Sequence, residues 1–139
     1  MRVNHIIVGT KNLEASYQFY ILLFGFKDCG SFIDTGTQKE GKVLTWHLTG
    51  EPLLQLLLVP FTEERHPNPQ HIAFEVNETE FNLIYQKAKN HGFKIRTRSS
   101  LDCVDEEIGY LEDGQFQYRN FYVSDPARVN IEIMTQCKI

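Results

Sequence analysis

Four polar side chains interrupt segments of the sequence that are otherwise apolar. His5 lies in NHIIV, His71 in QHIAFEV, Gln55 in the leucine run LLQLLLV, and Glu132 in NIEIM. A neutral imidazole, a carboxamide oxygen and a carboxylate are each unfavourable in an apolar wall, and one divalent cation can satisfy all of them. The residue types therefore predict a nitrogen and oxygen ligand set suited to Mn, Fe, Co, Ni or Zn, with positions left for water or substrate.

Each of these residues alone has a simpler explanation. A single histidine in a strand is more often a hydrogen-bonded structural residue than a ligand. Gln55 could satisfy a neighbouring backbone group, and Glu132 could lie in solvent at the edge of a sheet. The metal hypothesis is favoured because the four residues occupy related places in an internal repeat.

The repeat is visible when two segments are aligned. NHIIVGTKNLEASYQFYILLFGFKD covers residues 4–28, and QHIAFEVNETEFNLIYQKAKNHGFKI covers residues 70–95. Each contains a His-Ile strand, a polar connection, an amphipathic segment with aromatic residues at helical spacing, and then Gly-Phe-Lys. His5 corresponds to His71, and we expect a β-α-β opening that is used twice.

The elements around the repeat follow from periodicity and turn residues. Asn12 is placed to cap the first helix, and Gly92 is placed to end the second in a left-handed conformation. Strand pairs are predicted over 42–48 with 52–59 and over 116–123 with 129–135. The fold class is therefore α+β with two β-α-β-β-β modules, module one over about 1–62 and module two over about 70–139, joined by a polar linker at about 63–69.

Strand alternation places the polar residues on one face of each predicted sheet. In HIAFEV, Ile72 and Phe74 form the apolar set that faces the helix, so His71 points to the other side. Gln55 and Glu132 each lie on the last strand of their module. If the modules meet about a pseudo-twofold axis, both pairs of polar residues converge on one point in the groove between the sheets.

Length, charge and cysteine content narrow the function classes. A chain of 139 residues with 42% hydrophobic and 23% charged residues is typical of a single globular domain, here taken as 1–139. The net charge of −4 and the scattered basic residues argue against nucleic acid and membrane surfaces as partners. No signal-like N-terminus or long apolar run is present, so a cytoplasmic location is expected. Cys29, Cys103 and Cys137 are expected to be free thiols without a chemical role.

The sequence resembles the vicinal oxygen chelate superfamily, which includes glyoxalase I, fosfomycin and bleomycin resistance proteins, extradiol dioxygenases and methylmalonyl-CoA epimerase. The resemblance rests on NHIIV, FYILLFGF, QHIAFEV and YVSDPARVNIEIM. It implies a cup-shaped, mostly antiparallel sheet with the helices outside, a divalent metal ion, and His5, Gln55, His71 and Glu132 at the four ligand positions. It also implies a small-molecule substrate and a homodimer.

The subfamily is left open by the residues. The order His, Gln, His, Glu resembles methylmalonyl-CoA epimerases, but Leu44 stands where one of their bases is expected. Bacterial glyoxalase I generally has a glutamate in place of Gln55, while Tyr122 resembles an active-site tyrosine of fosfomycin resistance proteins. His5, His71 and Glu132 could equally form the iron site of an extradiol dioxygenase.

Within this family, the fourth ligand position supplied by Gln55 favours lyase or isomerase chemistry over oxygenation, through a metal-stabilised oxyanion and with Glu132 exchanging between ligand and base roles. An Fe(II) extradiol-type dioxygenase and a non-catalytic small-molecule binding protein are the alternatives. Asn120, Tyr122 and Trp46 are candidate substrate-binding residues, although core packing also accounts for the two aromatic residues. The acidic segment 99–117 is predicted to be a solvated loop, or a lid that disfavours anionic substrates.

Overall fold

The computed structural model describes residues 5–34, 38–48, 51–60, 71–97, 108–113 and 115–137. The chain divides into two compact units, Met1–Pro69 and Gln70–Ile139. In the described part of the chain, no helix is long and apolar enough to cross a membrane.

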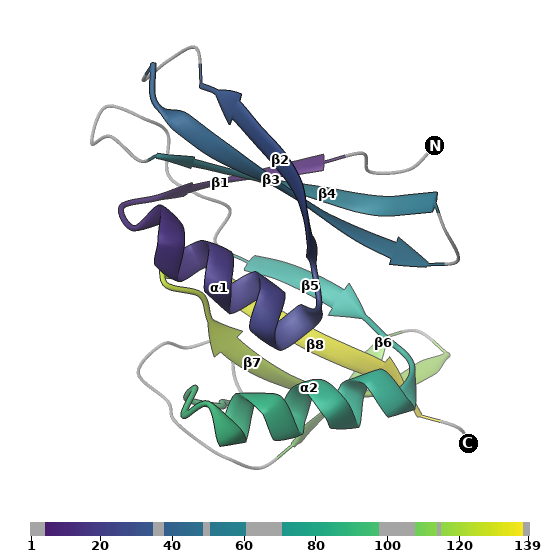
Figure 1. Cartoon of the computed structure of the whole chain (residues 1–139). Coiled ribbons are helices and arrows are strands. Elements are labelled where there is room, and N and C mark those ends of the chain that lie inside the picture. The colour runs from purple at the N-terminus through teal and green to yellow at the C-terminus, as the bar shows by residue number, and fades with distance from the viewer. Residues whose placement is uncertain are drawn as a thin grey trace. The chain divides into compact units, whose positions relative to one another are not determined.

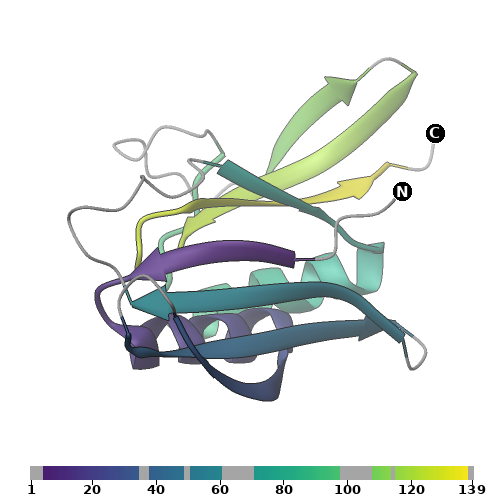
Figure 2. The ribbon, with the colours of Figure 1, turned by 90° about the horizontal axis from the view of Figure 1, so that it is seen from above.

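The first unit is a four-stranded sheet with one helix. Strand β1 runs parallel to β4, and the other neighbouring strands are antiparallel, in the order β1-β4-β3-β2. Figure 2 shows β1, β4 and β3 side by side. The elements are β1 (His5–Thr10), α1 (Leu13–Phe24), β2 (Lys27–Ile33), β3 (Glu40–Leu48) and β4 (Glu51–Pro60).

The second unit repeats this arrangement, with strand order β5-β8-β7-β6 and β5 parallel to β8 (Figure 1). Its elements are β5 (His71–Glu75), α2 (Glu78–Asn90), β6 (Gly109–Asp113), β7 (Phe116–Ser124) and β8 (Asn130–Gln136). The α+β fold class with two β-α-β-β-β modules is therefore confirmed. Both sheets are open, so their outer strands have an unpaired edge within the unit.

Both helices begin and end where capping chemistry predicts. The Asn12 side chain accepts a hydrogen bond from the Ala15 N–H at 3.1 Å, which satisfies one of the free donors at the start of α1. Asn77 and Glu80 form a reciprocal capping box on α2. Gly92 follows α2 with φ of 74°, a left-handed conformation that glycine adopts without a Cβ clash.

One face of each sheet carries the core. In the first unit, Val8, Leu44 and Leu56 are completely buried, and α1 packs against β3 and β4. In the second, Phe121 and Ile131 are completely buried, and α2 packs against β8. Burial of aromatic and branched side chains on one face leaves the alternate positions of each strand on the opposite face, here called the site face of that unit.

The structure corrects the predicted position of one strand. The repeat, which runs to Ile95, predicts a strand directly after the second helix, but this region contributes only an isolated bridge between Arg96 and Tyr122. The second strand of the module is instead β6, which lies in the segment predicted to be a loop. Its charged residue Glu112 is exposed, which is tolerated because β6 is an edge strand of the sheet. The rest of the acidic segment, 98–107 and 114, lies outside the described residues.

Candidate functional site

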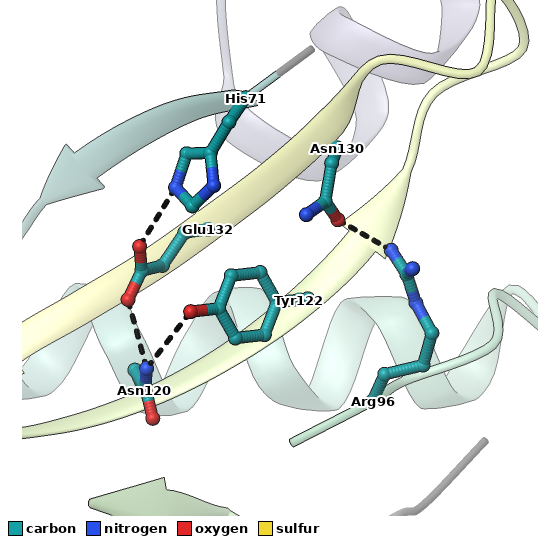
Figure 3. A network of polar contacts seen from close by, with 6 residues as sticks. All are labelled: His71, Arg96, Asn120, Tyr122, Asn130 and Glu132. Atoms are coloured by element: carbon teal, nitrogen blue, oxygen red, sulfur yellow. Dashed lines mark hydrogen bonds and ion pairs between the residues drawn. The ribbon is translucent and has the colours of Figure 1, made fainter. Parts of the chain in front are cut away.

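The best-defined polar cluster lies on the site face of the second unit and is centred on Glu132 of β8. The Glu132 side chain is only 5% exposed, although it carries a carboxylate. Its Oε2 atom lies 2.8 Å from Nε2 of His71 on the adjacent strand β5 (Figure 3). Strand pairing makes this contact possible, because parallel β5 and β8 bring Ala73, two residues beyond His71, opposite Glu132 on the same face.

The neighbouring strand β7 supplies two further members of the cluster. Asn120 donates a hydrogen bond from Nδ2 to Oε1 of Glu132 at 2.8 Å, and a longer one to the Tyr122 hydroxyl at 3.4 Å. Tyr122 is paired in register with Glu132 and packs edge-on against the His71 ring, with centroids 5.7 Å apart. The two strands therefore fix the carboxylate from both sides, as Figure 3 shows.

Tyr122 is held in its protonated form. Burial of the hydroxyl and the negative charge of Glu132 raise the pKa of Tyr122 to about 12. At neutral pH the residue is therefore a hydrogen-bond donor and not a base.

A buried arginine completes this face and was not identified from the sequence. Arg96 is 2% exposed, and its Nη2 atom donates to Asn130 Oδ1 at 2.7 Å and to Ser124 Oγ at 3.1 Å. Asn130 is the residue paired in register with His71. Removal of the guanidinium from water lowers the pKa of Arg96. The available sequence signal was the position of a charged residue directly after the buried Ile95, which is weak on its own.

In the first unit the structure brings His5 and Gln55 together on adjacent strands. The two residues are direct partners in the parallel pairing of β1 and β4, on the site face opposite the buried Leu56. Thr45 of β3 is the register partner of Gln55 on its other side and is almost completely buried. Thr45 was missed because a threonine between apolar residues is ordinary in a strand.

The register between the two parallel strands differs between the modules. Gln55 lies opposite His5 itself, whereas the residue opposite His71 is Asn130 and Glu132 lies two positions further along β8. A shift of two residues keeps a side chain on the same face of the sheet, so both polar pairs still lie on site faces.

Trp46 lies away from these residues. It alternates with Leu44 on β3, which places its side chain on the face that packs against the helix. The geometry of the first unit therefore gives no support to its predicted role in substrate binding.

The donor atoms in the second unit fit a metal ion in chemistry, because an imidazole nitrogen and a carboxylate oxygen are both common ligands of divalent ions. In this structure the two groups are hydrogen-bonded to each other at 2.8 Å. Among the described residues, no group of three histidine, cysteine, aspartate or glutamate side chains could hold a metal.

Comparison with known proteins identifies the family. The model of the Glyoxalase/Bleomycin resistance protein/Dioxygenase superfamily matches residues 2–133. Comparison with curated protein sequences gave no significant match.

Three solved structures illustrate the similarity of fold. Oxidase ChaP-H2 is 21% identical with a TM-score of 0.70, and the match covers 99% of this chain and 94% of that protein. A glyoxalase/bleomycin resistance protein/dioxygenase from Alicyclobacillus acidocaldarius is 18% identical with a TM-score of 0.64, covering 98% and 92% of the two chains. TnmS3, an antibiotic binding protein from Streptomyces sp. CB03234, is 14% identical with a TM-score of 0.67, covering 99% and 97%. With the two repeated modules and the family match over almost its full length, this chain belongs to the glyoxalase/bleomycin resistance protein/dioxygenase superfamily.

Proposed function

We propose that the protein is a divalent-metal-dependent enzyme that acts on a small oxygenated substrate, with His5, Gln55, His71 and Glu132 as the metal ligands. The observation that supports the proposal is the contact between the buried Glu132 carboxylate and the exposed His71 imidazole, whose Oε2 and Nε2 atoms lie 2.8 Å apart. The first unit offers His5 and Gln55 as the corresponding neighbours on its own site face.

The preferred chemistry is that of a lyase or isomerase. A bound divalent cation supplies Lewis-acid stabilisation of negative charge that develops on a substrate oxygen. Tyr122, which keeps its proton at neutral pH, donates a hydrogen bond toward such an oxygen. Glu132 would hold the ion through its carboxylate and is also the proposed base, which would accept the proton removed from the substrate. Gln55 favours this class over oxygenation, because a fourth protein ligand leaves fewer positions for dioxygen and substrate together.

The second candidate is an Fe(II) extradiol-type dioxygenase. It is favoured by the residue types, since His5, His71 and Glu132 form a set of two histidines and one carboxylate. The similarity in fold to Oxidase ChaP-H2 is consistent with this candidate and does not by itself assign oxidation to this chain.

Metal content tests the proposal. Protein purified without a metal-binding tag is loaded with each candidate ion, and metal per chain is measured for the native sequence, His71→Ala and the control His91→Ala. His91 is an exposed imidazole at the end of α2, so its loss is expected to leave the metal content unchanged. One ion per chain that is lost only in His71→Ala supports the proposal. No bound ion under any loading would contradict it and favour a binding protein without metal.

The reaction class is then separated by two assays on the loaded protein. A lyase or isomerase exchanges solvent deuterium into candidate thioesters or hydroxyketones, whereas a dioxygenase consumes oxygen with catechols. Oxygen consumption without proton exchange would replace the preferred candidate with the second one.

A further inference from the structure

Both oxygens of the Glu132 carboxylate already have fixed neighbours. Oε2 faces His71 Nε2 at 2.8 Å, and Oε1 accepts a hydrogen bond from Asn120 Nδ2, also at 2.8 Å (Figure 3). The same amide nitrogen reaches the Tyr122 hydroxyl at 3.4 Å. The two carboxylate oxygens are therefore not equivalent, since only Oε2 lies beside the other predicted ligand.

We propose that Asn120 is a positioning residue that holds Oε1 of Glu132 away from the metal and leaves Oε2 as the single coordinating oxygen. The inference rests on the proposed metal-dependent function. It assigns Asn120 a task other than the substrate contact expected from its position on the strand.

The hydrogen bond from Asn120 to Glu132 is of a type strong enough to hold the carboxylate in one orientation. Asn120 is 4% exposed and Glu132 is 5% exposed, so water competes little for either group. A hydrogen bond from a neutral amide to a carboxylate is shorter and stronger than one between neutral groups. Turning the carboxylate so that both oxygens face one ion would lengthen or bend this hydrogen bond, and a weakened donor in a buried place is unfavourable.

The edge strand β6 holds the Asn120 side chain from behind. Gly109 is the register partner of Asn120, and a Cβ atom added there would lie 2.9 Å from Asn120 Oδ1 and 3.3 Å from the backbone oxygen of Thr97. The first distance is shorter than real contacts of a Cβ atom, so the asparagine amide fits against a bare glycine. The absence of a side chain at Gly109 thus leaves room for the oxygen end of the Asn120 amide while its nitrogen end faces Glu132.

A consequence follows for the number of open coordination positions. A glutamate that binds through one oxygen occupies one position, whereas a chelating glutamate occupies two. By reserving Oε1, Asn120 keeps one more position available for water or a substrate oxygen. A residue that never touches the substrate would thereby determine how many substrate atoms can reach the metal.

Mn(II) provides the test, because the relaxation rate of water protons increases with the number of water molecules that exchange on the ion. The full chain loaded with one Mn(II) is compared with Asn120→Leu, which keeps a similar volume but removes the donor, and with Gly109→Ala, which keeps Asn120 and displaces it. Gln117→Leu, an exposed amide on the same strand, is the control. Infrared bands of the carboxylate, identified by their loss in Glu132→Gln, report one-oxygen or two-oxygen coordination.

We expect Asn120→Leu to hold one water fewer than the native protein, with a narrower separation of the Glu132 carboxylate bands. Gly109→Ala should change in the same direction, and Gln117→Leu should match the native protein. If the native chain binds Mn(II) and Asn120→Leu gives the same relaxation rate and the same bands, the inference is overturned and the proposed function stands. If the native chain binds no ion, the proposed function fails and the inference fails with it.

Discussion

The contact between Arg96 and Asn130 gives the sharpest quantitative prediction from the second unit. Arg96 is 2% exposed and Asn130 is 6% exposed, and the guanidinium donates to the amide oxygen at 2.7 Å. A hydrogen bond to a charged group contributes about 1.5–3 kcal/mol to stability. We therefore expect a coupling free energy of about 1.5–3 kcal/mol between Arg96→Met and Asn130→Ala in a double-mutant cycle.

The individual substitutions are expected to differ from this coupling. Arg96→Met also removes the bond to Ser124 and leaves the Asn130 oxygen without its buried donor, which destabilises the fold. It simultaneously removes a charge whose pKa is lowered by loss of hydration, which offsets part of that loss. Only the cycle separates the pair energy from these opposing contributions.

The assay is urea unfolding of metal-free protein followed by far-ultraviolet circular dichroism, with linear extrapolation to water. A control cycle uses Arg119 and Glu78, whose single contact is 3.5 Å long and involves a largely exposed carboxylate. That pair should couple by about 0.2–1 kcal/mol. A coupling between Arg96 and Asn130 that is no larger than the control value would refute the reasoning, because burial would then add nothing to the bond.

Three further predictions follow from the structure. The pKa of Tyr122 is raised to about 12 from its usual value near 10, so the metal-free protein should lose at most about 2–3 kcal/mol of stability between pH 10 and pH 12. Urea unfolding at each pH measures this loss, and Tyr122→Phe should not show it. Asn77→Ala breaks the capping box and should lower the free energy of unfolding by about 1 kcal/mol, while Asn82→Ala, on the exposed side of the same helix, should leave it unchanged or slightly raised; equal effects would contradict the capping role. Phe121→Ala, at a completely buried ring, should destabilise by about 3–5 kcal/mol, and Phe116→Ala, at a half-exposed ring of the same strand, by less than about 1 kcal/mol, as measured by thermal unfolding.

Local patterns were sufficient to predict most of the fold. Strand alternation correctly separated Ile72 from His71, because the two faces of a half-buried strand differ in polarity. Asn12 and Gly92 act as the helix caps expected of them, because capping depends on a few adjacent residues. The internal repeat then supplied the order of elements in both modules.

Strand β6 could not be predicted in the same way. Its sequence GYLED has a glycine and two acidic residues, which are uncommon in strands. It forms because β7 provides a pairing partner and because an edge strand leaves Glu112 exposed to water. Pairing of this kind depends on tertiary context, which a local pattern does not contain.

The residues of the candidate site were likewise predictable only where a local pattern marked them. His71 and Glu132 were found because polar residues in apolar strands are conspicuous, and the structure places them in contact. The role of Asn120 depends on which oxygen its amide reaches, and that follows from the register of β7 against β8. Arg96 lies after a helix and outside any regular strand, so no periodicity indicated that its side chain would be buried beside the site.

The central claim is that one ion is held by a histidine from each module. X-ray absorption spectroscopy of the metal-loaded native chain, together with His5→Ala and His71→Ala, tests it most directly by counting imidazole ligands. The account predicts two imidazoles in the native protein and one in each variant. A native count of one, unchanged by His5→Ala, would show that the first module contributes no histidine and would contradict the claim.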